Sequence, residues 1–232
     1  MPHVYGWEHL TYLAVFFIAA GVSLTLIKLK VKRQETADII IKISGGALFA
    51  LILWNRISIA VFKGDYKLIL PDSFCGLSSL CLSLCALFLK RDSLPLHCFC
   101  YLSFWGGAIV TFYPDFLGQA QSFLFPATIS GLLHHGAALY LSVLMFLTGY
   151  FKPCLKKFYA FPVGLSFMTV YGMFLIDALH FKKAMYIGAP LIEGTVLTWY
   201  FIALLLISAT LLLVFLYEKF LKRKPAAEEN GN

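Results

Sequence analysis

Seven apolar runs divide this sequence, and they constrain its fold more than any other feature. A membrane-spanning helix needs about 20 predominantly apolar residues. The runs cover about 9–27, 39–62, 73–89, 94–113, 125–150, 158–180 and 196–217. Hydrophobic residues make up 60% of the chain and charged residues only 13%, whereas soluble domains carry about 25% charged residues. The sequence therefore predicts an all-α polytopic membrane protein, a bundle of about seven transmembrane helices. We expect a single transmembrane domain over residues 1–224 and a disordered tail at 225–232.

The basic residues between these runs are distributed unevenly. If all seven runs cross a membrane, the loops on one side receive thirteen lysines and arginines, at positions 28, 30, 32, 33, 90, 91, 152, 156, 157, 219, 222, 223 and 224. The other side receives Lys63, Lys67, Lys182 and Lys183. Because cytoplasmic loops carry the excess of basic residues, this bias predicts an outside N-terminus and a cytoplasmic C-terminus in the cell membrane. The net charge of +7 then reflects topology, and no nucleic-acid partner is expected.

Two adjacent histidines lie within the longest uncharged stretch. No charged residue occurs from Phe123 to Tyr150. His135 follows Pro126 by nine residues, or roughly 13 Å along a helix axis, which places it near the middle of a ~30 Å hydrocarbon core. Ionisable groups at that depth usually face a bundle interior or a water-filled cavity and mark a functional site. In the alternative interpretation, His134 and His135 are neutral and tie helices together by hydrogen bonds.

Cys75 has the most informative position of the six cysteines. In the segment LPDSFCG, either Asp72 or Ser73 can cap the following helix, so Cys75 falls in its first turn. The helix dipole there favours a thiolate, and a thiolate near an intramembrane histidine is the minimum set for covalent acyl transfer. The alternative is that Cys75 is a small apolar packing residue.

Motifs for metals, cofactors and phosphates are lacking in the sequence. It has no CxxC pair, no glycine-rich phosphate loop, no GxSxG elbow and no HExxH. We therefore expect neither a metal nor a cofactor. The paired glycines Gly45-Gly46 and Gly106-Gly107 are expected to be contact points between helices.

Several polar residues are expected at the outer ends of the helices and are candidates for substrate binding. They are His9, Arg56, Asp72, Asp115, Asp177 and His180. Arg56 lies within the second run and needs a carboxylate partner at that depth, which the sequence leaves open among Asp72, Asp115 and Asp177. Asp177 and His180 are expected to share a helix face as an i, i+3 pair. The simpler alternative is that the outer helix ends are polar because they leave the membrane.

Short motifs along the chain resemble those of the bacterial YwaF-type integral membrane proteins. They are His9-Leu10, LPDSFC at 70–75, FWGG and YPDF within 104–116, His135-Gly136, and Trp199-Tyr200. That family looks distantly similar to eukaryotic multi-pass acyltransferases that remodel phospholipids with a membrane cysteine and histidine. The resemblance implies that Cys75 is the cysteine and His135 the histidine. Family members often read LPLHLC, and Ser73 stands here where that histidine stands.

These observations give a leading functional hypothesis and two alternatives. The first is an acyltransferase or transesterase acting on a membrane lipid, with Cys75 as nucleophile, His135 as general base and His134 as an orienting group or oxyanion donor. Arg56 would pair with a carboxylate or hold a lipid phosphate. The second is a non-catalytic transporter or lipid- or solute-binding protein with Arg56, Asp115, Asp177 and His135 along a path. The third is a structural subunit of a larger complex.

Overall fold

The computed structural model describes residues 2–187, 190 and 194–221, and within them the chain forms seven α-helices and no strand. The helices are α1 (Trp7–Lys30), α2 (Gln34–Lys63), α3 (Phe74–Phe88), α4 (Leu96–Phe112), α5 (Pro126–Leu147), α6 (Ala160–Asp177) and α7 (Trp199–Leu216). Short helical turns follow or separate them: η1 (Tyr66–Ile69), η2 (Leu117–Gln119), η3 (Leu155–Lys157) and η4 (Tyr217–Leu221). Each predicted apolar run thus corresponds to one helix, and α1 and α2 extend beyond the predicted runs at 9–27 and 39–62. The predicted tail at 225–232 and the basic residues at 222–224 lie outside the described residues.

Local signals set where several helices begin and end. The side chain of Ser73 caps α3 by accepting a hydrogen bond from the Gly76 N–H at 3.3 Å, and Pro126 occupies the first position of α5. The sequence predicted that the sixth helix would continue to residue 180. It ends at Asp177 because His180 has a φ of 57° and the Phe181 N–H bonds back to the Leu175 carbonyl oxygen. The expected i, i+3 pair of Asp177 and His180 on one helix face is therefore not formed.

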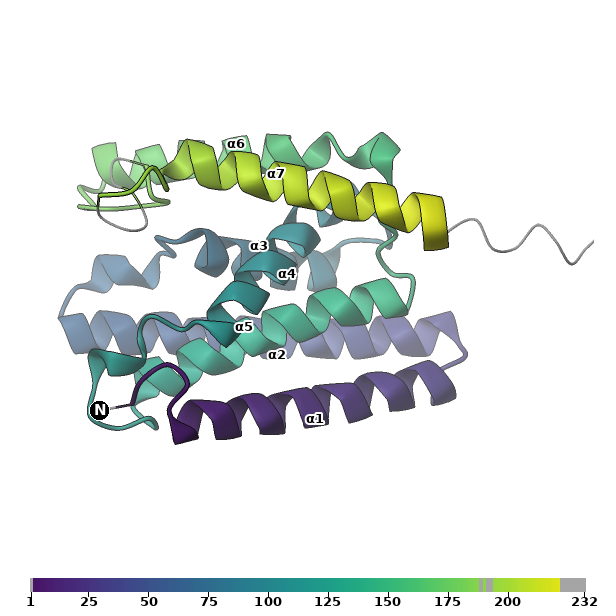
Figure 1. Ribbon diagram of the computed structural model, residues 1–232, viewed down its shortest axis with the longest axis horizontal. Helices are drawn as coiled ribbons and strands as arrows, with labels where there is room; N and C mark the ends of the chain where they lie inside the picture. Colours follow the sequence, from purple (N-terminus) through teal and green to yellow (C-terminus); the bar gives the residue numbers. More distant parts are fainter. Residues whose placement is uncertain (1, 188–189, 191–193, 222–232) are drawn as a thin grey trace, which may run out of the picture.

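Helix α5 lies at the centre of the bundle. It packs against α2 and α4, and α3 closes the group by packing between α2 and α4. Figure 1 shows α6 and α7 as a layer along one side of this core and α1 along the other. The N-terminus and the α6–α7 connection lie at one end of the molecule, and the α1–α2 and α5–α6 connections lie at the opposite end.

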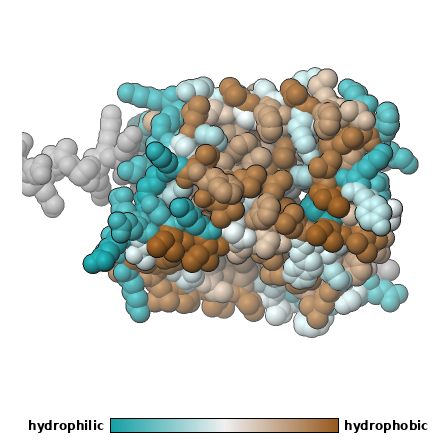
Figure 2. Space-filling view, turned by 180° about the vertical axis from the view of Figure 1, so that it is seen from behind, coloured by the Kyte–Doolittle hydropathy of each residue, from teal (hydrophilic) through white to brown (hydrophobic). Residues whose placement is uncertain are grey.

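The surface of the bundle is that of a membrane protein. Five helices, α1, α2, α5, α6 with the preceding η3 turn, and α7 with η4, are long and apolar enough to cross a membrane. Helices α3 and α4 are apolar but shorter, with 15 and 17 residues. Figure 2 shows a broad hydrophobic band with hydrophilic residues gathered toward both ends. These features indicate a multi-pass membrane protein.

An ion-pair cluster joins the α3–α4 connection to the α5–α6 connection. Asp92 forms an ion pair with Lys157 and accepts hydrogen bonds from the Lys152 N–H at 3.2 Å and from His97 Nε2 at 2.9 Å. Burial by itself raises the pKa of Asp92, but the hydrogen bonds from Lys157, Lys152 and His97 outweigh it and hold the pKa below its ordinary value. The cluster therefore favours the ionised carboxylate and fixes two loops to each other.

Candidate functional site

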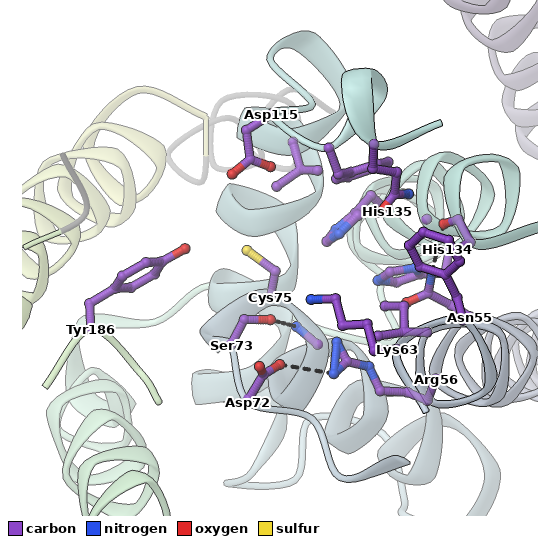
Figure 3. A pocket seen from close by; sticks show the side chains of 18 residues that line it. Asn55, Arg56, Lys63, Asp72, Ser73, Cys75, Asp115, His134, His135 and Tyr186 are labelled. Atoms are coloured by element: carbon purple, nitrogen blue, oxygen red, sulfur yellow. Dashed lines mark hydrogen bonds and ion pairs between the residues drawn. The ribbon is translucent and has the colours of Figure 1, made fainter. Parts of the chain in front are cut away.

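A cavity of about 310 Å³ lies where α2, α3, α4 and α5 meet, at the N-terminal ends of α3 and α5. We call it the histidine cavity. It is lined by Asn55, Arg56, Ile59, Phe62, Lys63, Asp72, Ser73, Cys75, Gly76, Val110, Asp115, Phe116, Gln119, Ala127, Gly131, His134, His135 and Tyr186. Figure 3 shows that the labelled polar side chains come from several elements and surround one space. All three predicted catalytic residues and three of the predicted binding residues are therefore brought together.

The two histidines lie nearly buried on α5, with exposed fractions of 4% for His134 and 7% for His135. The Nδ1 atom of His134 lies 3.2 Å from the Ser130 carbonyl oxygen. Because a carbonyl can only accept, Nδ1 carries the proton and Nε2 carries a lone pair. This Nε2 atom is buried and has no hydrogen-bond partner among the described residues. In this tautomer His134 Nε2 can accept a proton but cannot act as an oxyanion donor, which was one of the two roles expected from the sequence.

The rings of His134 and His135 lie against each other, with centroids 3.9 Å apart and planes inclined by 37°. The Phe116 ring also lies near His135, with ring centroids 6.3 Å apart and planes inclined by 27°. His135 Nδ1 is also buried without a hydrogen-bond partner among the described residues. The cavity therefore holds two imidazoles with unused ring nitrogens, an arrangement that a bound polar group can satisfy.

Asn55 of α2 fixes the beginning of α5 and was not among the site residues predicted from the sequence. Its amide donates hydrogen bonds to the Ala127 carbonyl oxygen and to Ser130 Oγ, each at 3.1 Å. Ser130 also provides the carbonyl that binds His134, so Asn55 supports the element that orients this histidine. The sequence feature that could have identified Asn55 is its position next to Arg56 within an apolar run.

Cys75 is the second residue of α3 and lies close to Gly106 of α4. A β-carbon added to Gly106 would lie 2.9 Å from the Cys75 sulfur. On the neighbouring position, a β-carbon added to Gly107 would lie 2.8 Å from the backbone oxygen of His135. The glycine pair therefore lets α3 and α5 approach α4 closely at adjacent residues, which confirms the expected helix contact. It also brings the thiol and the histidines to the same level of the bundle.

Arg56 forms its ion pair with Asp72, which settles the choice among three carboxylates. Its Nη1 atom donates to Asp72 Oδ1 at 2.9 Å and lies within hydrogen-bond distance of the carbonyl oxygens of Leu68 and Leu70, at 3.5 and 3.4 Å. Arg56 is only 8% exposed. The pair holds the segment after η1 against α2, just before α3 begins, so it shapes the wall of the histidine cavity.

Lys63 and Tyr186 also reach into the cavity, and neither was predicted from the sequence to lie there. Figure 3 shows Lys63 extending from α2 toward the centre of the space and Tyr186 facing it from the opposite wall. Burial, together with the negative groups around it, raises the pKa of Tyr186 to about 12. Its phenol therefore stays protonated at neutral pH and can donate a hydrogen bond.

Three predicted binding residues do not line this cavity. His9 is fully buried elsewhere: Nδ1 accepts a hydrogen bond from the Tyr5 N–H at 3.1 Å, and Nε2 donates to the Thr111 carbonyl oxygen at 3.0 Å. It links the start of α1 to the end of α4. Asp177 and His180 are exposed at the end of α6 and after it. The structure therefore reduces the predicted set of binding residues in this cavity to Arg56, Asp72 and Asp115.

Comparisons with family models, curated proteins and solved structures find no match for this chain. The roles of the residues consequently rest on the geometry of the cavity. Among the described residues, no group of three or more histidine, cysteine, aspartate or glutamate side chains could hold a metal ion.

Proposed function

We propose that this protein is an integral-membrane acyltransferase or transesterase that acts on a membrane lipid. One observation carries the proposal: the Cys75 thiol and two histidines with unused ring nitrogens line the same small cavity. A thiol and a general base in one site are the requirements for covalent acyl transfer. The resemblance to the YwaF-type proteins is part of this proposal. That resemblance is supported because three residues from the matching motifs, Cys75, Asp115 and His135, line one cavity.

The proposed location is the outer half of the cell membrane. In this topology all seven helices cross the bilayer, the N-terminus is outside and the C-terminus is cytoplasmic. The alternation of the helix connections between the two ends of the bundle supports it. Helix α3 has 15 residues and is about 22 Å long, shorter than a ~30 Å hydrocarbon core. The histidine cavity lies at its N-terminal end, so a lipid ester near the membrane surface can reach Cys75.

The first half of the proposed reaction forms an acyl-enzyme. His135 takes the proton of the Cys75 thiol, and the thiolate attacks the ester carbonyl carbon of the donor lipid. A carbon–sulfur bond forms and the ester carbon–oxygen bond breaks. The leaving alcohol oxygen receives the proton from His135, and a lysolipid departs. The protonated Tyr186 phenol donates to the carbonyl oxygen while it carries negative charge.

The second half transfers the acyl group to an acceptor. The acceptor hydroxyl attacks the thioester carbon and gives its proton to His135, a carbon–oxygen bond forms, and the carbon–sulfur bond breaks. The Cys75 thiolate then takes back the proton from His135. His134 accepts a hydrogen bond from the acceptor hydroxyl through the Nε2 lone pair, which orients this nucleophile.

The test is detection of the thioester on the full-length protein in phospholipid nanodiscs. The probe is a 3:1 mixture of phosphatidylethanolamine and phosphatidylglycerol carrying labelled acyl chains. We expect a hydroxylamine-sensitive acyl group on Cys75, its loss in Cys75→Ser and a strong decrease in His135→Gln. Cys81→Ser is the matched control and should acylate normally.

Acylation of other cysteines to the same extent, or lipid remodelling that persists in Cys75→Ser, would reject the proposal. The transport hypothesis makes the opposite prediction: solute uptake into proteoliposomes that survives Cys75→Ser. The exposure of Asp177, one of the groups assigned to the transport path, does not support that alternative.

A further inference from the structure

A second cavity, of about 450 Å³, lies between α4, α5 and the C-terminal part of α7. We call it the aromatic cavity. It is lined by Cys100, Tyr101, Phe104, Trp105, Ser142, Val143, Phe146, Phe151, Pro153, Leu213, Val214, Leu216, Tyr217 and Phe220. None of these residues lines the histidine cavity. Of the residues that the structure describes, none with a charged side chain lines it. Its volume falls within the ~300–1,000 Å³ range of small-molecule sites.

Two hydrogen bonds tie α7 and η4 to the bundle near the two ends of this cavity. Trp105 Nε1 of α4 donates to Thr210 Oγ1 at 3.0 Å, and the Leu155 N–H of η3 donates to Glu218 Oε1 at 3.4 Å. Thr210 and Glu218 are eight residues apart, or roughly 12 Å along a helix. Most of the α7 and η4 residues that line the cavity lie between them. The aromatic cavity is therefore bounded by contacts that hold α7 in place.

One side of the aromatic cavity is buried and the other is open. Tyr101, Phe151 and Val214 are 9%, 3% and 1% exposed, whereas Phe146 and Phe220 are 38% and 61% exposed. The exposed residues belong to α5 and to α7 with η4, which are long and apolar enough to cross a membrane. The open side therefore faces the hydrocarbon of the bilayer, and a lipid chain can enter from there.

The hydroxyl of Tyr101 indicates the chemistry of the occupant. Edge-on contacts with Phe151 and Phe161 fix its ring, with centroids 5.1 and 5.7 Å apart. The hydroxyl oxygen is buried and forms no regular hydrogen bond with the described residues. The Cys154 backbone N–H approaches this oxygen, but an N–H only donates, so the hydroxyl hydrogen still has no acceptor. Because a buried donor without an acceptor is destabilising, a ligand with a carbonyl oxygen suits this position.

The depth of Tyr101 matches that of a lipid ester. Tyr101 lies five residues after Leu96, the first residue of α4, or roughly 7.5 Å along the helix axis. This places it near one edge of a ~30 Å hydrocarbon core, where the ester groups of bilayer lipids lie. The cavity continues along α4 to Trp105, toward the middle of the membrane. An acyl chain that begins at an ester runs in the same direction.

We propose that the aromatic cavity binds an acyl chain of an ester lipid from the surrounding bilayer. The Tyr101 hydroxyl donates a hydrogen bond to the ester carbonyl oxygen, and the chain extends toward Trp105. The bound lipid fills the space beside α7, of which the structure buries three residues, Ala203, Thr210 and Val214. It therefore acts as a structural lipid that joins α7 to α4 and α5. This role is independent of acyl transfer in the histidine cavity.

Two other occupants do not fit the aromatic cavity. The C-terminal segment 222–232 is rich in charged and polar residues, and these would lose their hydration in an apolar space. A helix of a second copy is about 10–12 Å wide with its side chains, which is too wide for a cavity of about 450 Å³. A single hydrocarbon chain matches both the size and the lining.

Fluorescence of Trp105 provides a local test of binding. The protein is the full-length chain in uncharged detergent, with the other three tryptophans replaced by phenylalanine. The probe is methyl 9,10-dibromostearate, whose bromine atoms quench tryptophan at short range. We expect quenching that saturates and that excess methyl palmitate reverses. The analogue 9,10-dibromooctadecane, which lacks the ester, should bind more weakly.

Two variants test the assigned contacts. Tyr101→Phe should weaken binding of the ester probe by roughly fivefold, since one neutral hydrogen bond is lost, and should not affect dibromooctadecane. Val143→Phe adds a ring to the lining and should abolish saturable quenching. Val170→Phe is the matched control, because Val170 is 66% exposed on α6 and does not line the cavity. Unchanged ester binding in Tyr101→Phe, or saturable quenching that persists in Val143→Phe, would overturn the proposal.

A protein that retains Trp54 as its single tryptophan reports non-specific partitioning of the probe. Trp54 is 42% exposed on α2, so its quenching should rise with probe concentration without saturating. The same response at Trp105 would overturn the proposal, because the probe would then only dissolve in the detergent around the protein. So would equally tight binding of dibromooctadecane, since the ester carbonyl would then have no role.

A second measurement keeps all four tryptophans and separates the two cavities. Native mass spectrometry of the full-length protein after detergent washing should show one retained ester lipid. Its occupancy should fall in Tyr101→Phe and in Val143→Phe and should remain normal in His135→Gln. Loss of the lipid in His135→Gln with normal retention in Val143→Phe would place it in the histidine cavity and overturn the proposal.

Discussion

Gly106 of α4 and Cys75 of α3 are in such close contact that a β-carbon at position 106 would lie 2.9 Å from the cysteine sulfur. This distance is shorter than a normal contact, so the thiol occupies its position only because residue 106 has no side chain. The contact with α4 holds the proposed nucleophile in place. The position of the thiol therefore depends on Gly106, which has no reactive side chain.

Replacement of Gly106 by alanine should displace the thiol. We expect slower alkylation of Cys75 by a membrane-permeant maleimide and a loss of about 1–3 kcal/mol of stability from overpacking. Gly46→Ala is the control, since the nearest atom to its added β-carbon is a Leu87 methyl group at 3.9 Å. Mass-spectrometric labelling rates and thermal unfolding would show both effects. Unchanged alkylation of Cys75 in Gly106→Ala would contradict the contact.

Asn55 should be required for the correct position of His134. Asn55→Ala leaves the Ala127 carbonyl and Ser130 Oγ without their shared donor, and loss of buried hydrogen bonds of this kind costs about 1–3 kcal/mol. We expect a lower melting temperature and weaker thioester formation. Ser122→Ala, at a position in the loop before α5, should behave like the unmodified protein. If Asn55→Ala melts normally, the amide does not support α5.

The Arg56–Asp72 pair should show strong coupling in a double-mutant cycle. Asp72→Asn alone leaves a nearly buried guanidinium without its counter-ion and should destabilise the protein by about 1–3 kcal/mol, less than for a fully buried pair because Asp72 is one-third exposed. Arg56→Met combined with Asp72→Asn should recover part of this loss. The cycle is measured by thermal unfolding in detergent, and strictly additive effects would show that the pair contributes nothing specific.

The sequence predicted the helices better than the connections between them. Every apolar run corresponds to a helix because backbone polar groups within a membrane must be satisfied inside the segment itself. Polar residues in apolar surroundings, such as Cys75, His134 and His135, were also recognisable, and the structure brings them to one cavity. Residue type and burial alone did not select them, since His9 and His97 are also buried but lie outside this cavity.

The partner of Arg56 and the role of Tyr186 could not be predicted from the sequence. Asp72 becomes the partner because the chain turns back after η1 and returns its carboxylate to α2. Tyr186 enters the site because the Met185 N–H bonds to the Asp72 carbonyl oxygen, between residues far apart in the sequence. Both results depend on loop conformation, and composition and periodicity carry little information about it.

Acid should selectively weaken the ion-pair cluster around Asp92 that joins the α3–α4 and α5–α6 connections. Lys157 and His97 are the charged and titratable side chains that bond to this carboxylate, and they hold its pKa below the ordinary value of 3.8. A carboxyl group with a depressed folded-state pKa contributes stability above its unfolded-state pKa, and this contribution is lost as the pH falls through the folded-state pKa. The stabilisation by Asp92 should therefore be complete at pH 6 and decrease below pH 3.8.

Comparison of melting temperatures across this pH range for the unmodified protein and Asp92→Asn tests the prediction. At pH 6 the variant should melt at a lower temperature, because Lys157 loses its ion pair. The difference should shrink as the pH falls below 3.8, since protonation then removes the same charge from the unmodified protein. Asp177→Asn removes an exposed carboxylate at the end of α6 and should show no comparable difference. If the difference in melting temperature between the unmodified protein and Asp92→Asn stays constant down to the lowest pH, ionisation of Asp92 does not hold the two loops together.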